Sequence, residues 1–187
     1  MQTAARLRFS AEHYLAWEAT QAEKHEFVAG EVFAMLGARQ DHVIVSGNIF
    51  AALKQRLRGT PCRAYVADMK LKVEAADAFF YPDVMVSCHP EDRKSEQFIS
   101  NPTLIVEVLS DSTANYDRGG KFVAYRKLDS LKEYLVVDIE ARRVECFRRT
   151  ADNDWLLHDY VGEADCDLSS LNIRLPMADI FEDIEAV

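Results

Sequence analysis

The chain has 187 residues, of which 49% are hydrophobic and 28% are charged. This length suits a single domain, residues 1–187, with a full hydrophobic core, and the composition is that of an ordinary soluble protein. No apolar run approaches the roughly 18 residues of a membrane span, and the N-terminal sequence lacks the apolar core of a signal peptide. We therefore expect a cytoplasmic protein with no membrane partner.

The net charge of −9 arises in the C-terminal fifth of the chain. Residues 1–149 hold 21 basic and 21 acidic side chains, whereas residues 150–187 hold 1 basic and 10 acidic side chains. Such a segment is either a solvated face or a cover over a basic groove, and we favour the solvated face. The chain lacks the basic footprint that is typical of a tight DNA binder.

The cysteines indicate neither a metal knuckle nor a disulfide framework. They are far apart and show no CxxC spacing: Cys62, Cys88, Cys146 and Cys166. We expect reduced, mostly buried thiols.

The first third of the chain predicts a helix, a hairpin and a second helix. Ser10 can cap the first helix, and residues 25–36 alternate around a turn at Ala29-Gly30. Asp41 can cap the second helix, which ends at Gly59. The apolar face of this helix repeats every four residues and comprises Val45, Ile49, Leu53 and Leu57.

The middle of the chain predicts strands and one polar helix. Residues 62–75 indicate extended chain, and residues 79–88 indicate a further strand, with Pro82 near a strand start or a bulge. Residues 102–109 are almost entirely apolar, as in a central strand that is covered on both faces. A helix starting among residues 110–113 contains Gly119-Gly120, which costs roughly 2 kcal/mol relative to alanines unless a close contact requires them.

The last third predicts an antiparallel strand pair at residues 132–140 and 142–149, a third strand at residues 155–161 and a short closing helix. This order of elements gives an α/β or α+β fold with a mixed sheet.

Two predicted strands each contain one carboxylate among apolar residues. Asp83 lies in YPDVMV and Glu107 in LIVEVLSDST. Burying a carboxylate is costly unless a cation or dense hydrogen bonding compensates. The helix that follows, DRGGKFVAY, carries Lys121. These segments together predict a cation site.

The ordered motifs resemble the Uma-two family of endonucleases, whose fold is that of the PD-(D/E)XK superfamily. They are HEFVAGEV, a helix opening with His42, YPDVMV, LIVEVLSDST, D-x-x-x-K-x-x-x-Y and EYLVVD. The resemblance covers about Phe9 to Ile180. It implies a restriction-endonuclease-like α/β core, with a central mixed β-sheet flanked by helices, and an N-terminal helix and β-hairpin.

The resemblance also implies a function and a set of site residues. Asp83 and Glu107 map onto the acids that bind a divalent metal. The E-x-K lysine would fall at position 109, where this chain has Leu109, and the family places its lysine in the following helix, at Lys121. A glutamate at the place of Glu26 could hold a second metal or an outer-shell water.

Phosphodiester hydrolysis fits such residues on chemical grounds. Oxygen ligands suit Mg²⁺ or Mn²⁺, and the carbonyl of Val108 could join Asp83 and Glu107 as a third ligand. Lys121 would orient or help to deprotonate the attacking water and oppose charge on the phosphate, with Asp117 and Tyr125 one turn to either side to fix its position. We expect a Mg²⁺-dependent endodeoxyribonuclease whose substrate is DNA, and a homodimer would suit cleavage of both strands.

Other interpretations stay open at this point. Asp83 could simply be a cap or pair with Lys70 or Lys72, Glu107 could be a structural ion pair, and Lys121 and Glu26 could be surface residues. His42 is more typical of a cap or a core contact than of a ligand. The alternative functions are a catalytically silent module that binds nucleic acid or protein, and a metal-dependent hydrolase of another phosphate ester.

Overall fold

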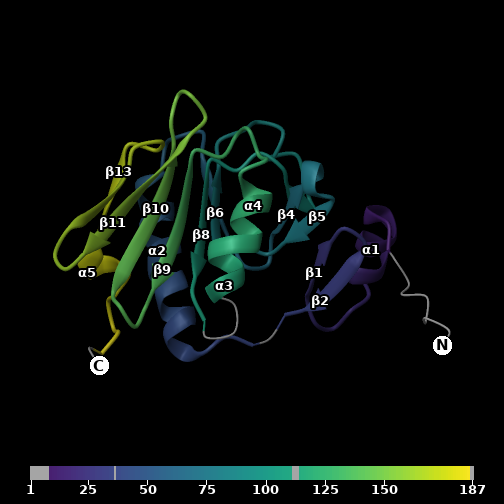
Figure 1. Cartoon of the computed structure of the whole chain (residues 1–187), viewed down its shortest axis with the longest axis horizontal. Coiled ribbons are helices and arrows are strands. Elements are labelled where there is room, and N and C mark those ends of the chain that lie inside the picture. The colour runs from purple at the N-terminus through teal and green to yellow at the C-terminus, as the bar shows by residue number, and fades with distance from the viewer. Residues whose placement is uncertain (1–8, 36, 111–113, 186–187) are drawn as a thin grey trace.

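The computed structural model describes residues 9–35, 37–110 and 114–185. Two mixed sheets and a C-terminal hairpin carry helices on their faces, so the predicted fold class is confirmed (Figure 1). Most of the residues predicted to start the polar helix, 110–113, and Leu36 of the predicted hairpin lie outside the described part of the chain. Within that part, no helix is long and apolar enough to cross a membrane.

The larger sheet has six strands in the order β11-β10-β9-β8-β6-β3. Its strands are β3 (Arg63–Val66), β6 (Val84–Ser87), β8 (Leu104–Val108), β9 (Glu133–Asp138), β10 (Arg143–Arg149) and β11 (Trp155–Val161). All pairs are antiparallel except β8 with β9. Every residue of β8 is buried, which confirms the predicted central strand.

One face of this sheet is covered by α2 (Gln40–Arg56), whose buried residues recur every four positions as predicted. Val45, Ile49 and Leu53 pack with inward side chains of the sheet such as Val84 and Val106. The predicted cap is wrong, because Asp41 lies in the first turn and the N-cap position is Arg39. Asp41 is still well placed there, since an acid favours the positive end of the helix dipole.

The opposite face carries the site-bearing helical segment and the smaller sheet. This segment comprises α3 (Ala114–Tyr116), a π-helical stretch η2 (Asp117–Lys121) and α4 (Phe122–Tyr125). The smaller sheet has the order β2-β1-β5-β4-β7. Its strands are β1 (His25–Val28), β2 (Glu31–Ala34), β4 (Lys70–Val73), β5 (Ala78–Phe80) and β7 (Phe98–Ile99), with the 3-10 turn η1 (Glu74–Ala76) between β4 and β5.

The predicted N-terminal elements are confirmed. The N-terminal helix α1 (Ala11–Glu18) begins at Ser10, whose hydroxyl accepts a hydrogen bond from the His13 amide at 3.2 Å. Strands β1 and β2 form the hairpin, and its turn residues Ala29 and Gly30 both have positive φ. Glycine suits such a position because it has no Cβ to clash.

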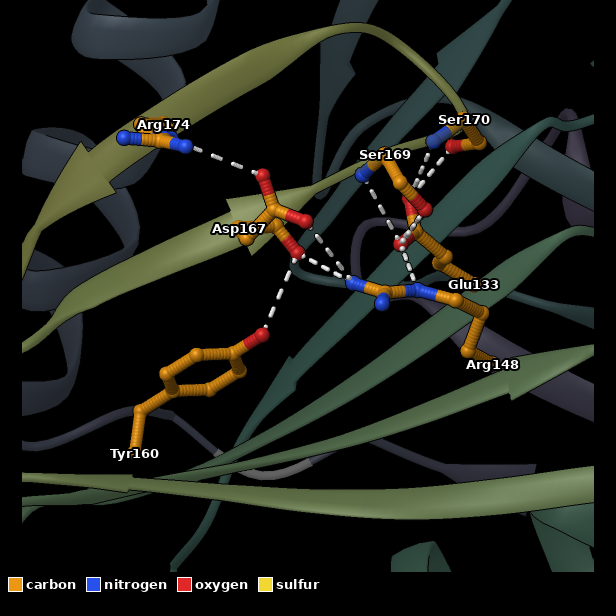
Figure 2. Close-up of polar contacts among 7 residues, drawn as sticks. All are labelled: Glu133, Arg148, Tyr160, Asp167, Ser169, Ser170 and Arg174. Atoms are coloured by element: carbon orange, nitrogen blue, oxygen red, sulfur yellow. Dashed lines mark hydrogen bonds and ion pairs between the residues drawn. The ribbon is translucent and has the colours of Figure 1, made fainter.

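The C-terminal hairpin, β12 (Asp165–Leu168) and β13 (Ile173–Pro176), is fastened to the larger sheet by a buried carboxylate, and α5 (Met177–Ile180) closes the chain. Figure 2 shows Glu133 of β9 between Arg148 and the serines of the hairpin turn. Its oxygens accept hydrogen bonds from Arg148 Nε at 2.8 Å and from the amides and hydroxyls of Ser169 and Ser170. Five donors therefore satisfy a side chain that is completely buried.

Two of the predicted strands are each divided between the two sheets. Residues 62–75 form β3 in the larger sheet and β4 in the smaller one, and residues 79–88 form β5 in the smaller sheet and β6 in the larger one. The second break falls at residues 81–83, where Pro82 has no amide hydrogen to donate to a ladder. The chain crosses between the sheets there, and this crossing positions Asp83.

The cysteine prediction is wrong for one pair. Cys62 and Cys88 form a disulfide, whereas Cys146 and Cys166 are free and buried as expected. The bonded pair follows from strand register, since Arg63 and Ser87 are cross-strand partners and the two cysteines are the next residues outward. Spacing along the sequence, 26 residues, carries no sign of this proximity.

Candidate active site

Asp83 lies at the crossing between the sheets and contacts a histidine from the covering helix. Its Oδ2 accepts a hydrogen bond from the Val108 amide at 2.8 Å and lies 3.2 Å from Nε2 of His42. Burial would lower the pKa of His42, but the hydrogen bond and charge of Asp83 outweigh burial, so this pKa is raised. The proposed pairing of Asp83 with Lys70 or Lys72 is not what the structure contains.

Glu107 points from β8 into the space between the sheet and the site-bearing helix. Its Oε1 accepts a hydrogen bond from the Tyr125 hydroxyl at 2.7 Å and lies 3.2 Å from the Lys121 ammonium. Only 3% of Glu107 is exposed. Burial raises the pKa of Glu107 well above its usual range, and Lys121 only partly opposes this effect.

Lys121 is the centre of the cluster and is surrounded by three carboxylates. Its Nζ lies 3.3 Å from Glu26 Oε1, 3.2 Å from Glu107 Oε1 and 3.1 Å from Asp117 Oδ1. Burial alone would lower the pKa of Lys121, but the carboxylates outweigh it and raise this pKa well above its usual range. The lysine is therefore held as a buried ammonium ion.

The π-helical stretch explains how Lys121 reaches this position. π-Helical turns are rare and occur frequently at functional sites. This one places Asp117 and Lys121 inward together, and the hydroxyl of Tyr134 donates a hydrogen bond to the Asp117 carbonyl at 2.9 Å. Gly120 has a steric reason, since a Cβ there would collide with the Tyr116 ring, whereas Gly119 has no such neighbour.

Negative charge exceeds positive charge in this cluster. Glu26, Glu107 and Asp117 share one ammonium, and Asp83 adds to the potential that raises the pKa of Glu107. Asp117 Oδ1 is buried and has no hydrogen-bond donor in bonding geometry, although Lys121 lies close to it. Such a surplus favours uptake of a proton or a hard cation.

No group of three or more His, Cys, Asp or Glu side chains in residues 9–35, 37–110 and 114–185 has the arrangement of a metal site. The acids are instead held by basic partners, Glu107 by Lys121 and Asp83 by His42. The donor set nevertheless consists of carboxylate oxygens, which are the ligands that Mg²⁺ and Mn²⁺ prefer.

The structure brings together most of the residues that the sequence singled out. Glu26 and Glu107 both contact Lys121. Asp83 accepts a hydrogen bond from the amide of Val108, the residue that follows Glu107. Asp117 contacts Lys121 as the one-turn spacing suggested, whereas Tyr125 contacts Glu107 instead of the lysine. Sequence reasoning missed the contact of His42 with Asp83, which depends on how α2 packs on the sheet.

Residues 11–178 match the Uma2 family, described as "Putative restriction endonuclease". The crystal structure of "a putative nuclease belonging to DUF820" from Anabaena variabilis ATCC 29413 superposes with a TM-score of 0.77. That likeness covers 92% of this chain and 97% of the other at 14% identity, so it bears on the fold alone.

Two relatives come from Synechocystis sp. (strain ATCC 27184 / PCC 6803 / Kazusa). "Uncharacterized protein slr1290" is 37% identical over 174 residues, which is 93% of this chain and 92% of the relative. "Uncharacterized protein sll1609" is 36% identical over 169 residues, which is 88% of this chain and 94% of the relative. With a family match that extends over most of its length, this chain belongs to the Uma2 family.

Proposed function

We propose that this protein is a metal-dependent endonuclease that hydrolyses phosphodiester bonds of DNA. The observation that carries the proposal is the buried cluster in which three carboxylates share the Lys121 ammonium. Membership of a family described as "Putative restriction endonuclease" supports this reaction class, and the fold is compatible with it.

The carboxylates fit a hard divalent cation. Asp83 and Glu107 would hold Mg²⁺ or Mn²⁺, with the carbonyl of Val108 as a further ligand and Glu26 at an outer position. A bound metal supplies a Lewis acid for the phosphoryl oxygens and lowers the pKa of water. The surplus of negative charge around Lys121 supports cation uptake, because a buried excess of carboxylates is costly without it.

Lys121 takes the role that the missing strand lysine would have. Leu109 is partly buried and packs against the apolar core, so position 109 has no ammonium to offer. Lys121 reaches Glu107 from the following helix instead, at 3.2 Å. Its ammonium would orient the attacking water and oppose charge on the phosphate, while Asp117 holds it in place.

A cleavage assay tests this proposal. Purified protein should cleave plasmid or single-stranded DNA in Mg²⁺ or Mn²⁺ and stop in EDTA, and Asp83→Asn, Glu107→Gln and Lys121→Met should each lower the rate at least ~100-fold. Asp68→Asn is the matched control, because Asp68 is an exposed carboxylate outside the cluster. Undiminished cleavage by Asp83→Asn would rule out the assignment. Small phosphodiesters in the same assay separate a DNA nuclease from a hydrolase of other phosphate esters.

A catalytically silent binding module is the second candidate, and one observation favours it. Both acids of the predicted metal pair already have a basic partner, His42 or Lys121. On this alternative the ion pairs hold the fold together and Mn²⁺ uptake is absent or unchanged in Asp83→Ala and Glu107→Ala. Light scattering would test the predicted homodimer.

A further inference from the structure

Two exposed aromatic side chains lie beside the carboxylate cluster. Phe33 is 49% exposed and Tyr116 is 41% exposed, although large apolar and aromatic groups usually lie inside. The first belongs to the edge strand β2 and the second to α3, just before the π-helical stretch.

The register of the N-terminal hairpin places Phe33 next to the cluster. Phe33 is the direct cross-strand partner of Glu26, whose carboxylate reaches Lys121. Directly opposed residues of an antiparallel pair project from the same face of the sheet, with Cβ atoms roughly 5 Å apart. The Phe33 ring therefore stands on the face that carries the Glu26 carboxylate.

Tyr116 lies beside the same cluster, where a glycine leaves room for its ring. Its ring occupies the space that a Cβ at position 120 would need. A helical glycine costs about 1 kcal/mol relative to alanine, and here it makes room for a ring that stays substantially exposed. Tyr116 directly precedes Asp117 of the cluster, and burial and the charge of Glu26 both raise the pKa of Tyr116.

The basic side chains of the site-bearing helical segment are both neutralised, so they offer little attraction for a phosphate backbone. Lys121 is surrounded by carboxylates, and Arg118 is paired with Glu145 and Asp138. Nucleic-acid binding that depends on phosphates needs unpaired lysines and arginines, whereas stacking of bases on aromatic rings does not.

We propose that Phe33 and Tyr116 form a stacking platform for unpaired nucleobases, so that the substrate of this site is single-stranded DNA. In a duplex each base face is covered by its neighbours, and a protein ring can stack only on a base that is unpaired or flipped out. This inference rests on the proposed nuclease function and names its substrate class.

Binding in EDTA tests the platform without cleavage. Fluorescence anisotropy is measured with a labelled single strand, with a strand of equal length that contains abasic positions, and with the duplex. The abasic strand keeps the phosphates and removes the bases. The single strand should bind at least roughly 10-fold more tightly than either of the other two probes, with a shallow dependence on salt.

Substitutions assign the effect to the two rings. Phe33→Ser and Tyr116→Leu should each weaken single-strand binding by roughly 5- to 100-fold, and Tyr116→Phe should retain it. Leu157→Ser is the matched control, because Leu157 is equally exposed but lies on β11, three strands from Glu107 in the sheet.

The platform is overturned if abasic and duplex probes bind as tightly as the single strand, if no probe binds, or if both folded variants bind normally. The nuclease proposal fails separately: base-dependent binding without cleavage of any DNA in Mn²⁺ would leave the platform standing, and cleavage of duplex with no base dependence would remove only the platform.

Discussion

Glu107 and Glu133 are buried carboxylates on the adjacent parallel strands β8 and β9, and they differ in how their charge is met. Glu133 receives five hydrogen bonds, from Arg148 and from the two serines of the C-terminal hairpin (Figure 2). Glu107 shares one ammonium with two further carboxylates, and its pKa is raised by burial. The charge of Glu133 is fully matched by donors that connect the larger sheet to the C-terminal hairpin. The cluster around Glu107 retains a surplus of negative charge.

This contrast separates two reasons for burying an acid. A carboxylate that fastens elements together is matched by donors, because unmatched burial destabilises the fold. A carboxylate that binds a substrate or a cation is not fully matched by donors within the fold, and this lowers the stability of the folded protein. The comparison predicts that substitutions of Glu133 and of Glu107 have opposite effects on stability.

The largest effect on stability is expected at Glu133. Glu133→Ala removes the acceptor of five hydrogen bonds and leaves Arg148 and the hairpin amides without it. Urea denaturation should show a loss of about 3 to 5 kcal/mol in the free energy of unfolding. Glu163→Ala, an exposed acid beyond β11, is the control and should change it by less than about 0.5 kcal/mol. A small loss for Glu133→Ala would remove the distinction between the two sites.

Lys121→Met should be the next most damaging, in a manner that depends on pH. It leaves three carboxylates without their shared ammonium, and the pKa of Glu107, which burial already raises, rises further above its unfolded value. Groups with raised folded pKa values contribute stability at low pH that is lost as pH rises through those values. We expect a loss of about 3 kcal/mol at pH 8 and a much smaller one at pH 5. Equal losses at the two pH values would contradict the surplus of charge.

Glu107→Gln should stabilise the protein while abolishing cleavage. The amide removes a buried charge but can still accept the Tyr125 hydrogen bond, and Lys121 keeps Glu26 and Asp117. Because the pKa of Glu107 is raised in the fold, wild-type protein loses stability relative to this variant as pH increases. Unfolding curves at pH 8 should show a gain of about 1 kcal/mol, with no gain at pH 4. Destabilisation at pH 8 would place Glu107 with Glu133 as a structural acid.

His42→Gln should have the smallest effect on stability, about 1 kcal/mol or less, because it removes one partly exposed contact to Asp83. Cleavage should fall about 10-fold, since Asp83 loses a group that orients its carboxylate. Asp83 keeps the Val108 amide, so the variant should remain folded. Unchanged cleavage would show that the histidine serves α2 packing alone.

The sequence predicted those helices and strands whose buried face is marked by a regular run or spacing of apolar residues. The four-residue spacing of Val45, Ile49 and Leu53, and the apolar strand around Glu107, give the helix and the central strand directly. The division of residues 62–75 and 79–88 between two sheets was not predictable, because each piece is short and both sheets accept the same alternation.

The candidate site was likewise predictable only where its features are local in the sequence. These features are the single acids in apolar strands and the one-turn spacing of Asp117 and Lys121. Three other contacts connect segments that are far apart in the chain. They are the contact of His42 with Asp83, the hydrogen bonds around Glu133 and the Cys62–Cys88 disulfide. Such contacts depend on how strands and helices pack, and sequence spacing alone contains no sign of them.

The most direct test of the central claim is calorimetric titration of Mn²⁺ into the folded protein. If the carboxylates around Lys121 are available to bind a hard cation, wild-type protein and Asp68→Asn will take up Mn²⁺ while Asp83→Asn and Glu107→Gln will not. Absence of uptake, or equal uptake by all four proteins, would mean that these acids are neutralised ion pairs of the fold and would contradict the account.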